Sequence, residues 1–252
     1  MARQMSDVSK IKAGRGTGTK ENWIPWNLST DGGVNSRKHA IPSILYNREL
    51  HALSTYEKDY FTMLEFLCDL DEIREQVPLD LAKTDEIRRK CGFKKVGNPH
   101  YKHRIMSTDC LLIFKNGKKK ALSIKPESEL NNPKVLQTAQ IECMYWNELN
   151  VDWSIGTEKE IPSILITNIN MIRPHFFQND VFANTVYEGL SSRQNRNESL
   201  RRILSEISKD LKILSGTSWK IFKQLCAQKR ITFDYNNPLN KDCLISEFYF
   251  TH

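Results

Sequence analysis

Long hydrophobic runs, glycine and proline are all scarce in this sequence. No apolar stretch approaches the ~18 residues that a membrane-spanning helix needs. The first ten residues, MARQMSDVSK, place no apolar segment behind their basic residues, so we expect no secretory signal. Only 11 glycines and 9 prolines occur among 252 residues, whereas 39% are hydrophobic. This composition excludes collagen-like, low-complexity and disordered chains, and predicts one large or two small globular domains.

Patterns typical of metal sites and disulfides are also missing. None of the six cysteines forms a Cys-x-x-Cys pair, and their spacing suits neither a zinc site nor a disulfide framework. The six histidines provide no metalloprotease-type pair, and neither Gly-x-Ser-x-Gly nor a Walker-type loop is present. We therefore expect the cysteines to be small buried hydrophobic residues in a reducing cytoplasm.

Basic residues outnumber acidic ones. Lys and Arg total 37 against 30 Asp and Glu, a net charge of +7, which favours anionic partners, most commonly nucleic acid. The excess is densest between residues 83 and 120, where twelve basic residues stand against three acidic ones. A charge run is often only a solvated surface, but this one surrounds Asp109, a metal-ligand candidate, and therefore favours nucleic acid. It includes Arg88–Lys90, Lys94–Lys95 and Lys118–Lys120.

The first forty residues are expected to form an irregular but ordered arm. Ala13–Thr19 is flexible and basic, but no strand precedes it and Pro25 follows too soon for a long helix. It therefore lacks the setting of a phosphate-binding loop. Trp23 and Trp26 are expected to fix this arm to the domain surface.

The segment from Ser54 to Gly156 has the pattern of an α/β domain. Ser54 and Glu57 form a Ser-x-x-Glu capping box at the start of a helix. Asn116-Gly117, between two alternating segments, is a strong hairpin signal. The first domain is expected to span residues 1–162. Its helices are expected at 54–71, 84–90 and 132–150, and its strands at 73–79, 106–114, 119–125 and 151–156.

After residue 162 the pattern becomes mostly helical. Three helical pieces are expected between residues 169 and 214, the last capped by Asn197, and then a helix capped by Thr217 or Ser218. Two strands follow, at 231–235 and 243–250. Three helices followed by a hairpin is the order of a winged helix, so residues 163–252 are expected to form a smaller winged-helix-like domain.

Asp109 and Lys125 lie near the same end of the predicted hairpin. A carboxylate there can hold Mg²⁺, which orients water and neutralises charge on phosphate oxygens, and a lysine can stabilise the developing negative charge. The register decides whether they meet. A two-residue turn at Asn116-Gly117 places Asp109 opposite Ile124, whereas an odd loop such as Asn116–Lys118 places it opposite Lys125. Phosphodiester hydrolysis by this pair therefore requires an odd loop or a bulge.

Each candidate also has a structural explanation. An isolated Asp–Lys pair on neighbouring strands is usually a surface ion pair, and a helix-cap role accounts for Glu57. Glu142 fits a solvated helix face, but its neighbours are apolar, and a carboxylate in such surroundings favours a partner, either Lys125 or a bound ion. The residues alone leave both interpretations open.

Several short motifs occur in a fixed order along the chain: Gly14–Gly18 with Trp23–Trp26, Leu53–Glu57, Asp71–Leu79, Met106–Asp109 and Ile124–Pro126. In this order they resemble the TnsA family, the endonuclease subunits of heteromeric cut-and-paste transposases. The resemblance covers most of the first 160 residues, whereas the tail is similar only in length and helical character. Together the motifs are much more specific than Asp109 and Lys125 alone.

The resemblance implies a restriction-endonuclease-like catalytic domain followed by a winged-helix-like domain. It implies Mg²⁺-dependent cleavage of the non-transferred strand near the 5′ ends of a transposon, with Mn²⁺ as a substitute. Glu57 and Asp109 match the family's metal-binding carboxylates, and Lys125 matches its catalytic lysine. Ile124 matches a position whose carbonyl can complete a metal shell. Glu142 matches an acidic residue on the helix behind the site.

The family also implies partners and a location. The partners are double-stranded DNA at the transposon ends, a DDE-type transposase subunit similar to TnsB, and an AAA+ regulator similar to TnsC that contacts the C-terminal domain. No membrane is involved. The expected location is the bacterial cytoplasm, at the nucleoid when the complex is active.

One position departs from the family pattern. Ser123 stands two residues before Lys125, where a family member has Gln and many related nucleases have Glu. A serine hydroxyl is shorter and uncharged, so it can act only through water or as an indirect ligand. Two further hypotheses therefore stay open. One is a DNA-binding or scaffolding subunit on a nuclease fold with weakened catalysis, and the other is a stand-alone restriction-type nuclease.

Overall fold

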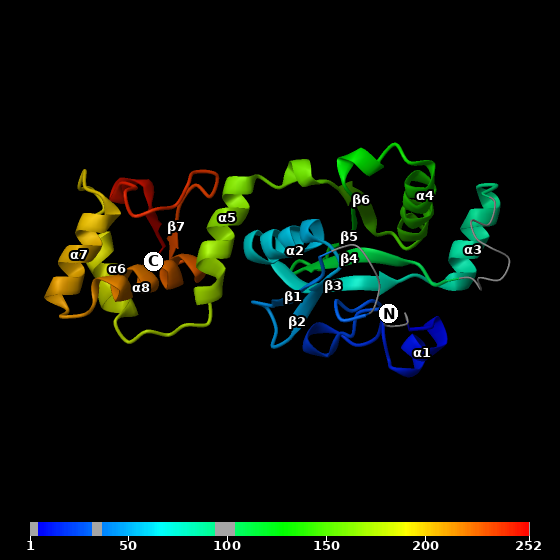
Figure 1. The fold of residues 1–252 in the computed structure, drawn as a ribbon, viewed down its shortest axis with the longest axis horizontal. Coiled ribbons are helices and arrows are strands. Elements are labelled where there is room, and N and C mark those ends of the chain that lie inside the picture. The colour runs from blue at the N-terminus through cyan, green and yellow to red at the C-terminus, as the bar shows by residue number, and fades with distance from the viewer. Residues whose placement is uncertain (1–4, 32–36, 94–103, 252) are drawn as a thin grey trace. The chain divides into compact units, whose positions relative to one another are not determined.

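The computed structural model describes residues 5–31, 37–93 and 104–251, and the chain divides into two compact units (Figure 1). The first unit is Met1–Ile161 and the second is Pro162–His252. The basic pair Lys94–Lys95 lies outside the described residues. In the described part of the chain, no helix combines the length and the apolar content needed to cross a bilayer.

The first unit is built on a mixed four-stranded sheet in the order β3-β4-β5-β6. β3 and β4 pair antiparallel, as do β4 and β5, whereas β5 and β6 pair parallel. Helix α4 makes the crossover between the two parallel strands. The bounds are β3 (Leu70–Pro78), β4 (Ser107–Phe114), β5 (Lys119–Ile124), α4 (Pro133–Glu148) and β6 (Asp152–Gly156).

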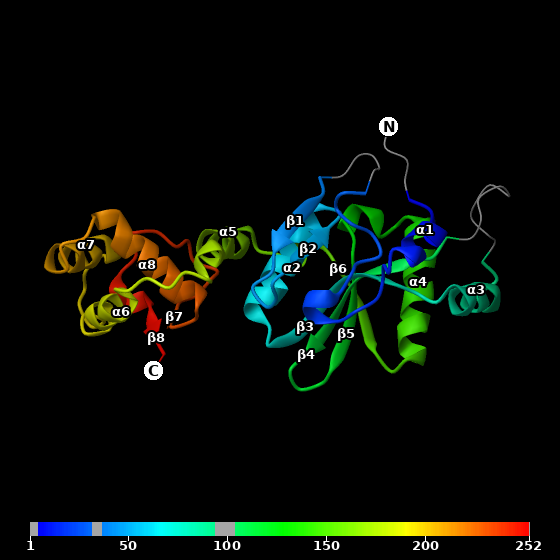
Figure 2. The same cartoon turned by 90° about the horizontal axis from the view of Figure 1, so that it is seen from below.

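Two helices cover opposite faces of this sheet (Figure 2). Phe61 of α2 (Thr55–Leu67) packs in one core cluster with Leu112, and Trp146 of α4 packs in another with Leu111. Successive residues of a strand point to opposite faces, so Leu111 and Leu112 place α4 and α2 on different sides. The expected α/β class is confirmed for this unit.

Four smaller elements surround the sheet. They are α1 (Asp7–Lys12), the antiparallel pair β1 (His39–Pro42) and β2 (Glu49–Ala52), and α3 (Leu81–Lys90), which follows the end of β3. Short 3₁₀ turns occupy Lys20–Asn22, Glu127–Glu129 and Glu158–Glu160.

The N-terminal arm is ordered and fixed by its tryptophans, as the sequence predicts. Trp23 and Trp26 are buried. The Trp23 indole Nε1 donates to the Glu75 carbonyl at 3.0 Å, and the Trp26 N–H donates to the Gln76 carbonyl at 3.0 Å. These two bonds attach residues 14–31, which we call the arm, to β3, the edge strand of the sheet.

The first helix is shorter than expected. The apolar spacing predicts a helix to Asp71, but α2 ends at Leu67 and Leu70 already belongs to β3. Leu70 and Ile73 are both buried in the core cluster beneath α2. The apolar position at residue 70 therefore serves the strand and not the helix.

The hairpin between β4 and β5 has an odd loop. Cys110 lies opposite Leu122, and the Phe114 N–H donates to the Lys118 carbonyl. The loop is thus Lys115–Gly117, with Gly117 at a positive φ of 81°, one residue earlier than the example that the sequence suggested. This register points Asp109 toward Ser123 rather than directly toward Lys125. It keeps all three at one end of the sheet.

The second unit is mostly helical, as expected. Its helices are α5 (Ser163–Ile172), α6 (Ala183–Ser191), α7 (Leu200–Asp210) and α8 (Ser215–Ala227), with 3₁₀ turns at Arg173–His175 and Ile245–Glu247. Two predicted caps are wrong. Ser199, not Asn197, caps α7, and α8 begins after Leu214 with no side-chain cap.

The terminal strands are much shorter than predicted. Only β7 (Ile231–Thr232) and β8 (Tyr249–Phe250) pair. The Asn168 side chain explains the difference: it donates to the carbonyls of Tyr235 and Asn237 and accepts from the Leu239 N–H. These backbone groups are therefore satisfied by α5 rather than by a partner strand.

The cysteines follow their prediction in part. None of the six, all of which lie in the described residues, forms a disulfide, but only Cys110 and Cys226 are fully buried and the other four are partly exposed.

Candidate active site

Asp109 and Lys125 meet where β4 and β5 diverge. Asp109 Oδ2 accepts hydrogen bonds from the Ile124 N–H at 2.7 Å and from Lys125 Nζ at 2.8 Å. Lys125 Nζ also donates to the Ile124 carbonyl at 3.0 Å. The sequence predicts this meeting if the loop is odd, and the loop is odd. The lysine amine is aimed at the carboxylate and not at bulk solvent.

Glu57 lies in the first turn of α2 and faces the same place. Its Oε2 accepts from the Leu53 N–H at 3.0 Å, and its Oε1 accepts from Ser54 Oγ at 3.0 Å. Ser54 caps the helix as predicted, through its Oγ and the Glu57 N–H, but the Glu57 side chain bonds the Leu53 N–H rather than the Ser54 N–H of a reciprocal capping box. Gln76 Nε2 donates to Glu57 Oε2 at 3.2 Å and to Asp109 Oδ1 at 3.3 Å. The same Nε2 atom therefore bridges the two carboxylates, with one hydrogen bond to each.

Glu142 reaches the site from α4. Its Oε2 accepts hydrogen bonds from Thr108 Oγ1 at 2.9 Å and from Ser123 Oγ, and the side chain is buried. Trp146 Nε1 donates to Thr108 Oγ1 at 2.8 Å and holds that hydroxyl in place. The predicted residue on the helix therefore contacts the serine that departs from the family pattern.

Burial and mutual repulsion shift the protonation of these acids. Burial, followed by the charge of Asp109, raises the pKa of Glu57 to about 7. Burial and Asp109 also raise the pKa of Glu142 to about 7. Burial lowers the pKa of Lys125, but the charge and hydrogen bond of Asp109, together with the charges of Glu142 and Glu57, outweigh it and the net shift is upward. Carboxyl groups whose pKa values lie near 7, next to a charged lysine, are typical of functional sites.

The metal-free protein is expected to lose stability as pH rises because of Glu142. The folded-state pKa of Glu142, about 7, lies above its ordinary value of 4.5. Its stabilising contribution is therefore complete below about pH 4.5 and is lost as pH rises through 7. Glu142→Gln should make the fall in unfolding free energy between pH 5 and pH 8 smaller by about 1–3 kcal/mol. Urea denaturation in a chelator measures this, and equal slopes in both proteins would contradict it.

The donor set at this end of the sheet suits a hard divalent cation. Glu57, Asp109 and the Ile124 carbonyl supply only oxygen atoms, which Mg²⁺ prefers. The raised pKa values of the buried Glu57 and Glu142 carboxyl groups also indicate that a positive charge would be stabilised there. In the described residues, no group of three or more His, Cys, Asp and Glu side chains is arranged to hold a metal ion. Two carboxylates and one carbonyl are the fitting set.

The basic surface is divided between the two ends of the sheet, which corrects one expectation. The hairpin tip, with Lys118–Lys120 beside it, lies at the end opposite Asp109, because Asp109 is five residues before Phe114, the last residue of β4, a rise of about 17 Å. Arg88–Lys90 belongs to the last turn of α3, which starts at the Asp109 end, and Arg88 contacts Met106 Sδ at 3.6 Å. Of the described groups, only the one on α3 lies near the candidate site.

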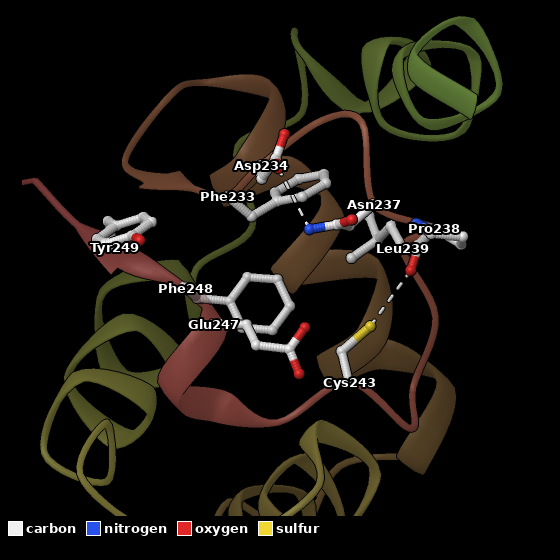
Figure 3. Close-up of a pocket in the computed structure, with 9 residues that line it drawn as sticks. All are labelled: Phe233, Asp234, Asn237, Pro238, Leu239, Cys243, Glu247, Phe248 and Tyr249. Carbon is white, nitrogen blue, oxygen red and sulfur yellow. Dashed lines mark hydrogen bonds between the residues drawn. The ribbon is translucent and has the colours of Figure 1, made fainter. Parts of the chain in front are cut away.

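A pocket of about 260 Å³ lies in the second unit, apart from these groups (Figure 3). Its Asp234 accepts from Asn237 Nδ2 at 3.2 Å, and its Cys243 Sγ contacts the Pro238 carbonyl at 3.4 Å. The Glu247 carboxylate, which also lines the pocket, accepts from the Leu244 N–H at 2.9 Å. These side chains are engaged within residues 234–247, and we place the candidate active site in the first unit.

Comparison with known proteins assigns the chain to a family. A family profile described as TnsA-like endonuclease N terminal matches residues 69–158, and one described as TnsA endonuclease C terminal matches residues 160–235. Over 167 residues the chain is 33% identical to the transposon Tn7 transposition protein TnsA of Escherichia coli, covering 65% of this chain. The chain belongs to the TnsA-like endonuclease family. The resemblance seen in its motifs is confirmed.

The match to the family does not reach every site residue. The N-terminal profile includes Asp109, Ile124, Lys125 and Glu142, whereas Glu57 precedes its first matched residue. The aligned segment spans 60% of the length of the Escherichia coli protein. The placement of Glu57 beside Asp109 therefore depends on the structure.

Sequence reasoning missed two residues of this site. Thr108 Oγ1 donates a hydrogen bond to the Glu142 carboxylate, and the Gln76 amide donates to both Glu57 and Asp109. Gln76 lies within the motif Asp71–Leu79, but neither its amide nor its backbone stands out in the sequence. Its positive φ of 50° is visible only in the structure.

Proposed function

We propose that this protein is a metal-dependent DNA endonuclease that cuts the non-transferred strand at the 5′ ends of a transposon. The observation that carries the proposal is the meeting of Asp109 with Lys125 and, through Gln76, with Glu57. These residues come from β4, the end of β5 and α2, so their meeting depends on the fold. A simple surface ion pair would not bring a second, buried carboxylate to the same place.

Each residue then has a defined part in hydrolysis. Glu57, Asp109 and the Ile124 carbonyl would hold Mg²⁺, or Mn²⁺ in its place. The metal supplies neutralisation of charge on the phosphate oxygens and orientation of the attacking water. Lys125, kept cationic by Asp109, stabilises the negative charge that develops at phosphorus. Glu142, held by Thr108 and Ser123, adds a carboxylate behind the reacting groups.

The Ser123 contact argues against loss of catalysis. Ser123 alone would suggest a scaffolding subunit whose catalytic site has lost activity, because many related nucleases have Glu at this position. In the structure Ser123 Oγ donates to the Glu142 carboxylate. A carboxylate therefore reaches this position from α4, although the strand does not supply one.

We also propose partners and a location from the family assignment. The substrate is double-stranded DNA at transposon ends, joined by a DDE-type transposase subunit and an AAA+ regulator that contacts the C-terminal domain. The relative in Escherichia coli is named as a transposition protein of transposon Tn7. The activity would then be located in the bacterial cytoplasm, on the nucleoid.

The test is a nicking assay with the full set of components. A plasmid carrying both transposon ends is incubated with this protein, the transposase subunit and the regulator. Nicks at the 5′ ends are expected with Mg²⁺ or Mn²⁺ and not with a chelator. Equal nicking without the partners would favour a stand-alone nuclease. Normal assembly with no 5′ nicks under any divalent ion would favour the scaffolding alternative.

A further inference from the structure

Gln76 has an uncommon backbone in the centre of the candidate site. It is buried and adopts φ of 50°, in the left-handed region that non-glycine residues rarely enter. Its carbonyl accepts from the Trp26 N–H at 3.0 Å, and the preceding carbonyl of Glu75 accepts from Trp23 Nε1 at 3.0 Å. The arm therefore holds this short stretch of β3 in place at two successive carbonyls.

The hydrogen bonds leave the Gln76 amide only one orientation. Its Oε1 accepts from Asn27 Nδ2 at 3.0 Å and from Ser107 Oγ at 3.1 Å. Asn27 is oriented in turn, because its Oδ1 accepts from Lys10 Nζ, an ammonium that can only donate. With its oxygen facing two donors, Gln76 must turn its Nε2 toward the Glu57 and Asp109 carboxylates.

We propose that Gln76 is a positioning residue of the metal site, oriented by the N-terminal arm. The inference rests on the proposed function, because it concerns the same two carboxylates. An amide donor shared by Glu57 Oε2 and Asp109 Oδ1 offsets part of their repulsion without adding a charge that would compete with a cation. Groups that orient metal ligands typically change affinity 10–100-fold when they are removed.

A purely structural role predicts something different. If Gln76 mattered only for its left-handed backbone, asparagine would serve as well or better, because Asn tolerates this conformation. Asparagine keeps the amide but is one methylene shorter, so it cannot reach both carboxylates. Gln76→Asn therefore separates positioning from backbone strain, and Gln76→Met keeps the length while removing the donor.

The experiment measures Mn²⁺ binding to the full chain by titration calorimetry, alongside urea denaturation. We expect about 10-fold or weaker Mn²⁺ affinity for both Gln76→Asn and Gln76→Met, with Gln76→Asn unfolding at or above the wild-type urea midpoint. Gln140→Asn, on the exposed side of α4, is the matched control and should bind as wild type. Affinities within twofold of wild type for both Gln76 variants would overturn the inference.

A second pair of variants tests the role of the arm. Asn27→Ala removes the donor that orients the amide, and we expect it to weaken Mn²⁺ binding about threefold in the wild-type background. In the Gln76→Met background it should cause no further loss, because it acts through Gln76. Additive losses would contradict this route. If the wild type itself neither binds Mn²⁺ nor nicks DNA, the proposed function fails as well. If it does both while the variants bind normally, only this inference fails.

Discussion

Asp109→Asn should lower the rate of 5′-strand nicking by the assembled transposition complex by about 10³-fold or more. The variant removes the negative charge of Asp109, whose carboxylate accepts hydrogen bonds from three other groups of the site. Asp109 Oδ2 holds Lys125 Nζ and the Ile124 N–H, and Oδ1 faces Gln76 Nε2. An asparagine must place an NH₂ group against one of these donors, so the cluster loses both a metal ligand and its geometry.

The control for this experiment is Asp69→Asn. Asp69 is exposed and pairs with Lys115 at the hairpin end of the sheet, far from the candidate site. It should nick at the wild-type rate. Gel filtration of each variant with its partner subunits verifies assembly, which should be unchanged for both. Normal nicking by an assembled Asp109→Asn protein would contradict the assignment of Asp109.

The elements that the sequence predicts well are those whose signals are local. Helix α4 begins after an Asn132 cap with Pro133 in its first turn, and both signals are within the segment itself. The β4–β5 hairpin follows from Asn116-Gly117. The predicted end of α2 and the predicted length of the last strands were wrong because they depend on contacts distant in sequence. Leu70 packs in the core of the sheet, and the Asn168 side chain, about seventy residues away, takes the place of strand pairing.

The candidate site divides in the same way. The sequence could place Asp109 and Lys125 near one end of the hairpin, but it left open the parity of the loop, which decides whether they share a face. Glu57 was ambiguous from its local pattern, because a position at the start of a helix also accounts for it, and only the family resemblance pointed to a metal ligand. Gln76 could not have been found: its backbone conformation and its contact with Asn27, 49 residues away, depend on where the arm packs.

Glu142→Ala should lower the nicking rate about 10²-fold, and adding Ser123→Glu should restore a large part of it. Ser123 Oγ donates directly to Glu142 Oε2, so the two side chains are neighbours across β5 and α4. Truncating Glu142 removes a buried carboxylate and empties space beside residue 123. A glutamate at 123 then returns a carboxylate to nearly the same place, on the strand where many related nucleases carry it.

Ser123→Glu alone separates charge from space. With Glu142 present, a second buried carboxylate has no room and repels the first, so this single variant should be less stable and less active than wild type.

Glu148→Ala, near the exposed end of the same helix, should have no effect on nicking, because Glu148 pairs only with Lys83 and Lys90 among the described residues. Nicking at the wild-type rate by Glu142→Ala would show that Glu142 serves only as the hydrogen-bond acceptor of the Ser123 and Thr108 hydroxyls. A low rate that Ser123→Glu fails to raise would show that the carboxylate must come from α4, because only the helix then aims it correctly.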